Sequence, residues 1–281
     1  MRIGSHVSIA GGIWNAPGNA AKVGAEVFQI FSRSPHGGPV KPIDEEAKAK
    51  FSAEMKKHKL DTFYIHTPYF INLASTKNNI YYGSISVIRQ ELERGTMLGC
   101  QAVMTHLGSF GELTDKQGIE RTVIAIGKIL EGYLGTTQLL LEMSAGAGRI
   151  IGDTFEELEQ ILDHPKLKKR HLAVCFDTCH AFTAGYDLRT RESVAKTLKQ
   201  FDRLIGFERL VMIHANDSKA ELGKHLDRHE HIGQGFIGLK GFEALVNHEH
   251  LSKLDWILET PKDDPKDDPK NIAVLKKLRQ D

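Results

Sequence analysis

Six short apolar runs along the chain each end on a residue type that binds metal ions, and their spacing is nearly even. The steps between the end residues are 40, 36, 35, 37 and 45 residues. A strand, a loop and a helix of ordinary length occupy about this much chain. This regular alternation is the feature that most restricts the fold. The end residues are His66, His106, Glu142, Asp177, His214 and Glu259.

Two further apolar segments, Arg2 to Val7 and Val27 to Phe31, bring the expected strands to eight. Between the strands, apolar residues recur at three- and four-residue spacing, which is typical of amphipathic helices. Sustained alternation of strand and helix predicts an α/β fold with a parallel sheet. We therefore predict a single (β/α)8 TIM barrel domain over residues 1–281, with its active site at the C-terminal ends of the strands. The expected helices cover residues 45–59, 77–98, 114–134, 154–162, 192–205 and 271–279.

Composition excludes several other classes of protein. No run of about 18 apolar residues is present, so we expect no membrane span. The chain enters a strand-like segment at once, which leaves no room for a signal peptide. Its three cysteines form no even disulfide framework, so we expect a cytoplasmic protein. The net charge of +1 means that any nucleic-acid role must rest on a local basic groove. We also expect a monomer, although no sequence feature determines the oligomeric state.

The six strand-end residues favour a metal site. Side chains at the carboxyl ends of parallel barrel strands converge on one face. Buried carboxylates are costly unless they are paired or bound to metal, so Glu142, Asp177 and Glu259 on that face require cations. Three histidines beside them supply the imidazoles that zinc prefers. One strand ending on histidine would be unremarkable, but six strands ending on metal-binding residue types favour metal binding over structural ion pairs.

More candidate ligands lie in loops at the same end of the barrel. His180 follows the sixth strand by three residues. The loop after the seventh strand holds four candidates of equal parity, and alternate residues of an extended segment point the same way. Spacing alone therefore leaves the choice among these four open. They are His225, Asp227, His229 and His231.

The two cysteines near the sixth strand could also be considered as ligands. Cys175 lies within an apolar run, which favours a place in the core. Cys179 has no second cysteine nearby on the active face. The remaining ligands exceed the needs of one ion and suit two or three zinc ions with a shared carboxylate. Clustered divalent ions favour hydrolysis of phosphate esters.

The segment Pro261 to Pro269 is the one low-complexity part of the sequence. Its repeated Lys, Asp and Pro residues predict a solvated charged loop after the eighth strand.

Taken together, these segments resemble the endonuclease IV family, which are zinc-dependent apurinic/apyrimidinic endonucleases of DNA repair. The likeness runs through the whole chain, beginning with Gly4–Gly12, and is strong because many motifs occur in the same order. Its other segments are His66–Leu73, Glu142–Gly148, Phe176–Gly185, His214–Ser218, Arg228–Gly235 and Glu259–Pro261.

The resemblance implies a βα barrel that holds three zinc ions and needs no other cofactor. It leaves His225 and His231 as loop residues beside the site. The implied ligands of the first ion are His66, His106 and Glu142; of the second, Glu142, Asp177, His214 and Glu259; and of the third, His180, Asp227 and His229.

The reaction implied by the resemblance is hydrolysis of the phosphodiester 5′ to an abasic site in double-stranded DNA. The products are a 3′-hydroxyl and a 5′-deoxyribose phosphate. Glu142 is the implied catalytic residue, because it bridges two ions and positions the attacking hydroxide. The third ion would stabilise the departing 3′-oxygen.

Two loops are expected to contact the DNA. Tyr69 and Phe70, after the third strand, match the family's intercalating positions, although on residue type alone they could equally pack over the barrel mouth. The loop after the second strand departs from the family pattern of an Asn, a basic residue and a Trp. There His36 takes the place of the usual Arg, and Gly38 stands at the Trp position. We therefore expect a weaker grip on abasic DNA with intact metal chemistry.

Two alternatives remain open. A sugar isomerase or epimerase of the xylose-isomerase-like barrels would use one divalent metal, and the residues implied for the second ion would satisfy it. A non-catalytic DNA-binding barrel is the other, but the complete set of ligands argues against it. The isomerase leaves five candidates unexplained, namely His66, His106, His180, Asp227 and His229.

Overall fold

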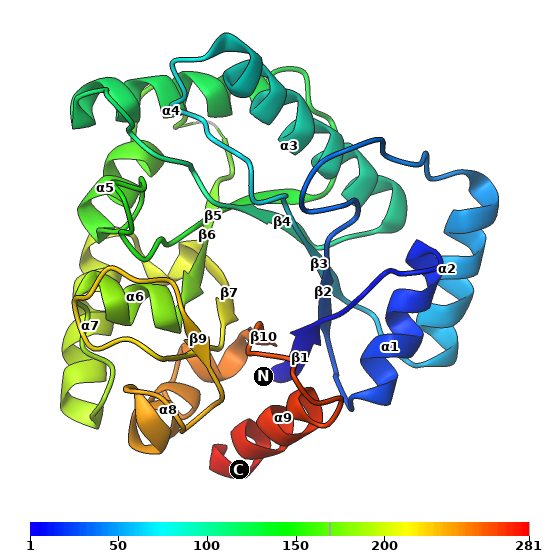
Figure 1. Cartoon of the computed structure of the whole chain (residues 1–281), viewed down its shortest axis with the longest axis vertical. Coiled ribbons are helices and arrows are strands. Elements are labelled where there is room, and N and C mark those ends of the chain that lie inside the picture. Colours follow the sequence, from blue (N-terminus) through cyan, green and yellow to red (C-terminus); the bar gives the residue numbers. More distant parts are fainter. Residues whose placement is uncertain (169, 281) are drawn as a thin grey trace.

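A computed structural model describes residues 1–168 and 170–280, and its centre is a closed barrel of eight parallel strands (Figure 1). The order around the barrel is β1-β10-β7-β6-β5-β4-β3-β2, so the first strand pairs with the last. The predicted (β/α)8 fold is confirmed. The strands are β1 (Arg2–His6), β2 (Phe28–Ile30), β3 (Phe63–His66), β4 (Ala102–Thr105), β5 (Gln138–Glu142), β6 (Ala173–Asp177), β7 (Leu210–His214) and β10 (Asp255–Leu258).

Helices surround this barrel, and each of the six expected helices is present with shifted ends (Figure 1). In the described part of the chain, no helix combines the length and the apolar character needed to span a membrane. The six helices are α2 (Glu45–Lys57), α3 (Asn78–Leu98), α4 (Asp115–Leu130), α5 (Phe155–Leu162), α7 (Arg191–Leu204) and α9 (Asp267–Leu278).

Local sequence explains where several of these helices begin. The Thr114 hydroxyl accepts from the Gln117 N–H, and the Gln117 side chain accepts from the Thr114 N–H. This capping box satisfies N–H groups that have no partner inside the helix. The side chains of Asp44 and Thr154 accept from the N–H groups of Ala47 and Glu157 at the starts of α2 and α5. Gly99, with a φ of 76°, ends α3 in the left-handed conformation that glycine adopts readily.

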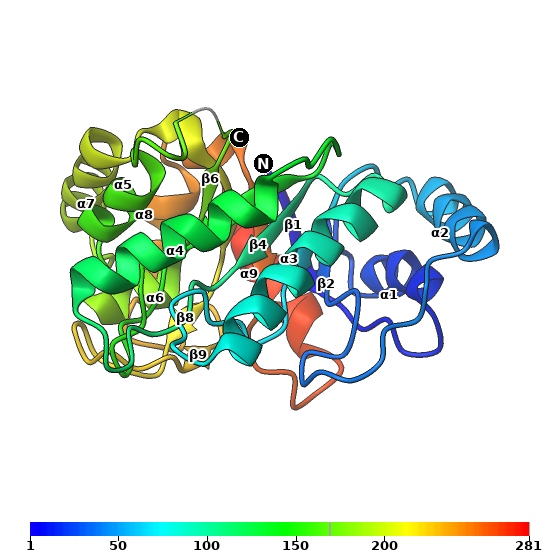
Figure 2. The ribbon, with the colours of Figure 1, turned by 90° about the horizontal axis from the view of Figure 1, so that it is seen from above.

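Several short helices and strands of the structure were not predicted from the sequence. They include helices α1 (Ala16–Lys22), α6 (Thr178–Ala184) and α8 (Gly238–Val246), of seven, seven and nine residues. A two-stranded antiparallel ribbon of β8 (Asp217–Ser218) and β9 (His229–Glu230) follows β7. In Figure 2 the ribbon lies at the edge of the molecule opposite the N-terminus.

The expectation for the segment 261–269 was wrong in its second half. Helix α9 begins at Asp267, whereas the expected helix began at residue 271, and both Asp267 and Asp268 are buried. Asp267 accepts a hydrogen bond from the Asp264 N–H, and Lys262 pairs with Asp268 at 2.5 Å. Acidic residues in a first helical turn are favoured by the helix dipole. The charges of this segment therefore begin a helix, and only its first residues form an exposed loop.

The barrel interior is filled by the inward-facing residue of alternate strand positions. Cys175 belongs to this inner core, as expected, and the other members are apolar apart from Tyr64. At the amino-terminal end of the barrel, Tyr64 donates a hydrogen bond to Asp255 at 2.8 Å, and Arg2 binds the same carboxylate. Side chains two positions further along the strands form the next layer, at the carboxyl end.

Glu157, in the first turn of α5, allows the cost of burying a carboxylate to be measured. Its carboxylate accepts from the Gly152 N–H at 2.7 Å, and burial raises its pKa to about 7. Because this pKa lies above the unfolded value, the folded state binds more protons between about pH 4.5 and 7, and stability falls as pH rises through that window. We expect Glu157→Gln to raise the free energy of unfolding by about 1–2 kcal/mol above pH 7, after allowance for partial exposure. Denaturant unfolding at pH 5 and pH 8 measures this gain, and an equal gain at both pH values would contradict the assignment.

Candidate metal centre

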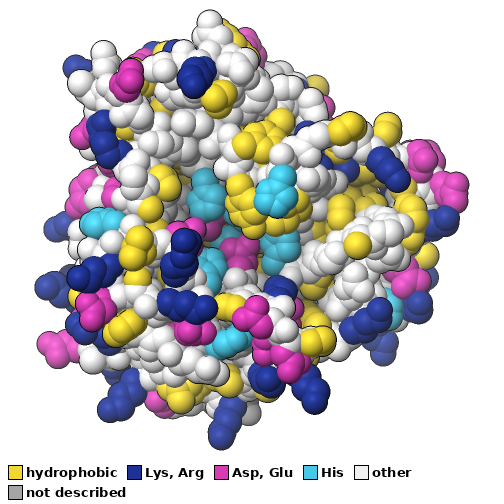
Figure 3. Space-filling view, in the orientation of Figure 1, with side chains coloured by type: hydrophobic (Ala, Val, Ile, Leu, Met, Phe, Trp, Pro, Cys, Tyr) yellow, Lys and Arg dark blue, Asp and Glu magenta, His cyan; other side chains and the backbone are white. Residues whose placement is uncertain are grey.

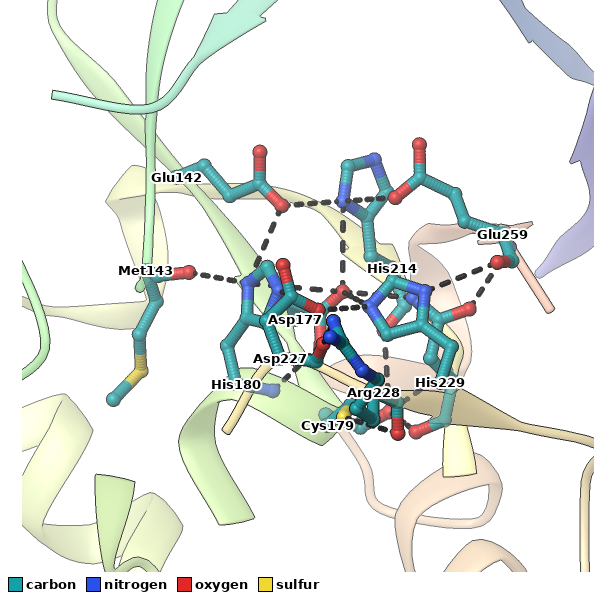
Figure 4. Close-up of polar contacts among 12 residues, drawn as sticks. Glu142, Met143, Asp177, Cys179, His180, His214, Asp227, Arg228, His229 and Glu259 are labelled. Atoms are coloured by element: carbon teal, nitrogen blue, oxygen red, sulfur yellow. Dashed lines mark hydrogen bonds and ion pairs between the residues drawn. The ribbon is translucent and has the colours of Figure 1, made fainter. Parts of the chain in front are cut away.

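The Glu142 carboxylate lies among the strand-end histidines, and Figure 4 shows its contacts with His180 and His214. Its Oε2 is 3.1 Å from His66 Nε2 and 3.6 Å from His106 Nε2. Its Oε1 is 2.8 Å from His214 Nδ1. The ligand atoms of His66, His106 and Glu142, which we call the first group, all lie within 4.8 Å of one another.

A second group shares Glu142 with the first. It joins the ends of β5, β6, β7 and β10, and its ligand atoms also lie within 4.8 Å of one another. His214 Nδ1 is 3.8 Å from Asp177 Oδ2 and 3.5 Å from Glu259 Oε2. The members of the second group are Glu142, Asp177, His214 and Glu259.

The third group comes from two elements that the sequence did not predict. Helix α6 begins directly after β6, where Asp177 accepts from the His180 N–H at 2.8 Å and fixes the first turn. The β8–β9 ribbon pairs Ser218 with His229 and carries Asp227 at its edge. Asp227 Oδ1 lies 3.2 Å from both His180 Nε2 and His229 Nε2, which completes the third group (Figure 4).

Backbone carbonyls orient three of the imidazoles. The Nδ1–H groups of His66, His180 and His229 donate to the carbonyls of Thr67, Met143 and Glu259 at 2.6, 2.9 and 3.0 Å. Each ring therefore presents its Nε2 to the centre, the arrangement that metal-binding histidines use.

Two of these inward nitrogens test whether the site fits a metal ion. His180 Nε2 and His229 Nε2 are buried and have no hydrogen-bond partner within the described chain. Both are close to Asp227, but without the geometry of a hydrogen bond. An unpaired buried nitrogen is costly. A divalent cation would satisfy both nitrogens, and imidazole with carboxylate is a donor set that suits zinc.

The charges of the site complement each other. Burial alone would raise the pKa of Glu142, but the charges on His106 and His214 outweigh it and hold that pKa well below the ordinary value. Burial opposes the protonation of His229, yet the contacts with Asp227 and Asp177 raise its pKa to about 9. The ionised form of Glu142 is thus stabilised by its positive neighbours, and the Asp227 and Asp177 carboxylates make His229 more basic, which favours cation binding at these positions.

The remaining candidates lie outside the three groups. His225 is 4.0 Å from Asp153, and His231 Nδ1 accepts a hydrogen bond from Asn271 at 3.0 Å. The Cys175 thiol lies beside Glu142 and His214, where burial raises its pKa to about 12. Burial also raises the pKa of Cys179, whose thiol faces the carbonyl of Arg228. Both cysteines are thus neutral thiols packed beneath the site.

The three residues expected to contact DNA lie together at the barrel mouth. Tyr69 is 61% exposed and Phe70 is 42% exposed. The His36 and Tyr69 ring centroids are 6.2 Å apart, and the Tyr69 N–H donates to the Pro35 carbonyl. In Figure 3, apolar and histidine side chains gather beside the hollow that exposes the central histidines and carboxylates.

The loop after β2 is anchored to α3. The Arg33 guanidinium pairs with Glu91, which is fully buried, and Ser32 donates to the same carboxylate. Arg94 donates to the Ser32 and Lys41 carbonyls. Arg33 is therefore committed to the protein interior and is not free to bind a phosphate.

Three polar residues that contact the ligands were not predicted from the sequence. Gln29 donates to Glu259 Oε1 at 2.6 Å, and His6 Nδ1 lies 3.3 Å from the same atom. Asn216 donates to Asp177 Oδ2 at 2.7 Å. The available signal was a polar residue inside an apolar strand, because both His6 and Gln29 have the inward parity of their strands.

Comparison with known proteins places this geometry in a family. Residues 17–278 match the family described as xylose isomerase-like TIM barrel. The chain is 42% identical to a probable endonuclease 4 of Methanoculleus marisnigri, covering 98% of both chains. It is 39% identical to a probable endonuclease 4 of Chloroflexus aggregans, covering 99% of this chain and 97% of that protein.

Solved structures extend the comparison. Endonuclease IV from Thermus thermophilus superposes with a TM-score of 0.87 at 33% identity, covering 99% of this chain and 98% of that one. A D-tagatose 3-epimerase-like protein reaches a TM-score of 0.75 at 19% identity, over 99% of this chain and 97% of that one, which shows the shared fold alone. With these relatives matched over nearly their whole length, the chain belongs to the endonuclease IV family of xylose isomerase-like TIM barrels.

Proposed function

We propose that this protein is a zinc-dependent AP endonuclease that hydrolyses the phosphodiester 5′ to abasic sites in double-stranded DNA. The products are a 3′-hydroxyl and a 5′-deoxyribose phosphate. The observation that carries the proposal is the third group, where two buried imidazole nitrogens lie beside Asp227 and have no hydrogen-bond partner among residues 1–168 and 170–280. We further propose one domain over residues 1–281 that acts as a monomer in the cytoplasm.

Three zinc ions would be held by the first, second and third groups, with Glu142 shared by the first two. Zinc bound there lowers the pKa of water and neutralises charge on phosphoryl oxygens. Glu142 is the proposed catalytic residue, because its ionised carboxylate lies between the groups and can orient the attacking water. The backbone carbonyls behind His66, His180 and His229 keep these rings in place during the reaction.

A sugar isomerase or epimerase with one divalent metal is the alternative within the same fold. The second group alone would serve such an enzyme. The third group has no task in a one-metal enzyme, and the first group would be equally unexplained. A non-catalytic DNA-binding barrel would likewise leave the three groups without a role.

Incision of a defined duplex tests the proposal. Zinc-loaded protein is incubated with a 5′-labelled duplex that contains one tetrahydrofuran abasic analogue, and an undamaged duplex serves as control. We expect one cut 5′ to the analogue, with a fragment that a DNA polymerase extends from its 3′-hydroxyl. Metal analysis should give three zinc ions per chain. Protein that binds one ion and leaves the abasic duplex intact would move the assignment to the isomerase.

We propose that His36, Tyr69 and Phe70 contact the DNA. Tyr69 and Phe70 are exposed aromatic residues beside the metal centre, which suits insertion between bases. His36 is exposed on the neighbouring loop, whose arginine is bound to Glu91. Because Arg33 is held by Glu91, we infer that its charge adds little to DNA affinity.

Tyr69→Ala is expected to weaken binding of an abasic duplex about 10-fold, because stacking on a base contributes about 1–3 kcal/mol. The dissociation constant is measured with zinc-loaded protein by fluorescence anisotropy. Tyr82→Ala is the matched control, since Tyr82 is 53% exposed but lies on α3 outside the barrel. Equal affinities of the Tyr69 and Tyr82 variants would remove Tyr69 from the DNA interface.

A further inference from the structure

We propose that Gln29 is a positioning residue that fixes the metal-facing atoms of His214 and Glu259. The inference rests on the proposed function only in taking the second group to bind a metal ion. Gln29 itself has no ligand atom in any of the three groups.

The position of Gln29 is unusual for a primary amide. It is the middle residue of β2, a strand of three residues, and it is fully buried. Its neighbours Phe28 and Ile30 pack in the outer core, so the Gln29 side chain faces the barrel interior. An amide buried there is costly unless it is hydrogen-bonded. The partners of Gln29 must therefore account for its presence.

The amide of Gln29 contacts three residues at or just beyond the carboxyl ends of three different strands. Its Nε2 donates to Glu259 Oε1 at 2.6 Å and lies 2.9 Å from His6 Nδ1. Its Oε1 lies 2.8 Å from His214 Nε2. The reverse orientation of the amide would place its carbonyl oxygen against the Glu259 carboxylate. Only one orientation therefore satisfies these neighbours.

This orientation decides which atoms face the centre. His214 must carry its proton on Nε2 in order to donate to Gln29, so Nδ1 is left to face Glu142 and Glu259 Oε2. On Glu259, the Oε1 atom is taken up by Gln29, and Oε2 is left toward His214 Nδ1. One amide thus sets the orientation of two ligands in the second group.

His214 depends on a side chain where other ligands depend on the backbone. His66, His180 and His229 are held by carbonyl oxygens, which no substitution removes. The partner of His214 Nε2 is instead the Gln29 side chain. The second group therefore has an orienting contact that a single mutation can delete.

The distribution of ligands among the strands also supports a positioning role for Gln29. Six strands place an expected ligand at or just beyond their carboxyl ends, whereas β1 and β2 supply none. His6 and Gln29 face each other in the register of these two strands. They complete the ring of polar side chains at this level of the barrel by binding the ligands.

The test compares three variants in metal-binding assays. Gln29→Met keeps the length of the side chain but removes both hydrogen-bonding functions. Gln29→Glu still accepts from His214 but offers no N–H to Glu259. The control is Tyr64→Phe, because Tyr64 lies beside Gln29 in register but donates to Asp255 at the other end of the barrel. Zinc affinities are measured by chelator competition, and cobalt-substituted protein gives an absorption spectrum of the ligand field.

We expect both Gln29 variants to lose 10- to 100-fold in affinity for one metal ion, with altered cobalt absorption and unchanged binding of the others. Tyr64→Phe should keep every metal affinity. The proposal is overturned if Gln29→Met binds all its ions as the parent protein does. It is also overturned if all ions weaken together with a loss of folded structure.

These outcomes are independent of the nuclease assay. If the parent protein fails to incise abasic DNA while Gln29→Met still weakens one ion, the nuclease proposal falls and the positioning role stands. The second group also serves the one-metal alternative, so the role of Gln29 can be measured in either case.

Discussion

Replacing Glu142 by glutamine is expected to lower the rate of abasic-site incision about 10³-fold. Glu142 is fully buried, and nitrogens of His66, His106, His180 and His214 lie within 3.6 Å of its carboxylate oxygens. The variant keeps the shape of the side chain but removes its charge from the point where the first and second groups meet. Single-turnover incision of a duplex with one abasic analogue measures the rate.

Glu157→Gln is the matched control for this prediction. It makes the same chemical change on a partly buried glutamate that belongs to none of the three groups. It should incise DNA at the parent rate, and far-ultraviolet circular dichroism should show both variants folded. A Glu142→Gln variant that keeps more than a tenth of the parent rate would remove Glu142 from the catalytic role.

Replacing Asp227 by asparagine is expected to lower the zinc content from three ions to two and the incision rate about 10²-fold. The Asp227 side chain is half-exposed, and it supplies the only carboxylate of the third group. Without its charge, His180 and His229 retain their orientation but lose the anionic partner that completes the site. Metal analysis after gel filtration gives the zinc content.

Asp153→Asn provides a control on a neighbouring loop. Asp153 also faces a histidine, His225 at 4.0 Å, but it takes no part in the three groups. This variant should keep three zinc ions and the parent rate. An Asp227→Asn protein that retains three ions and full activity would contradict the assignment of the third group.

The barrel and most of the metal centre could be predicted because the strand and helix patterns repeat at regular intervals along the sequence. Strands and helices alternate at nearly even steps. Because side chains alternate between the two faces of a strand, the residue at each strand end points into the barrel like the residue two positions before it. His66 and Glu142 could therefore be assigned to one face of the barrel from the order of the residues alone. The third group needed the family resemblance, because four residues of equal parity in the segment 225–231 could not be separated by spacing.

Contacts between distant parts of the chain could not be predicted in this way. Gln29 binds Glu259 and His214, which lie 230 and 185 residues away in sequence. No local pattern marks such a partner. The short helix α6 was missed for another reason, since its seven residues are fixed mainly by the Asp177 cap. Composition predicted that Asp267 and Asp268 lie in a solvated loop. They begin α9 instead, because the helix dipole favours acidic residues there and Lys262 pairs with Asp268.

The pairing of β1 with β10 has a consequence for the timing of synthesis. His6 and Glu259 touch across this seam, so the first and last strands must both be present before the site is whole. A growing chain that has not yet released Glu259 from the ribosome carries eight of the nine proposed ligands and an open sheet. The second group is still incomplete at that stage. A translation product truncated before Glu259 should therefore leave DNA uncut.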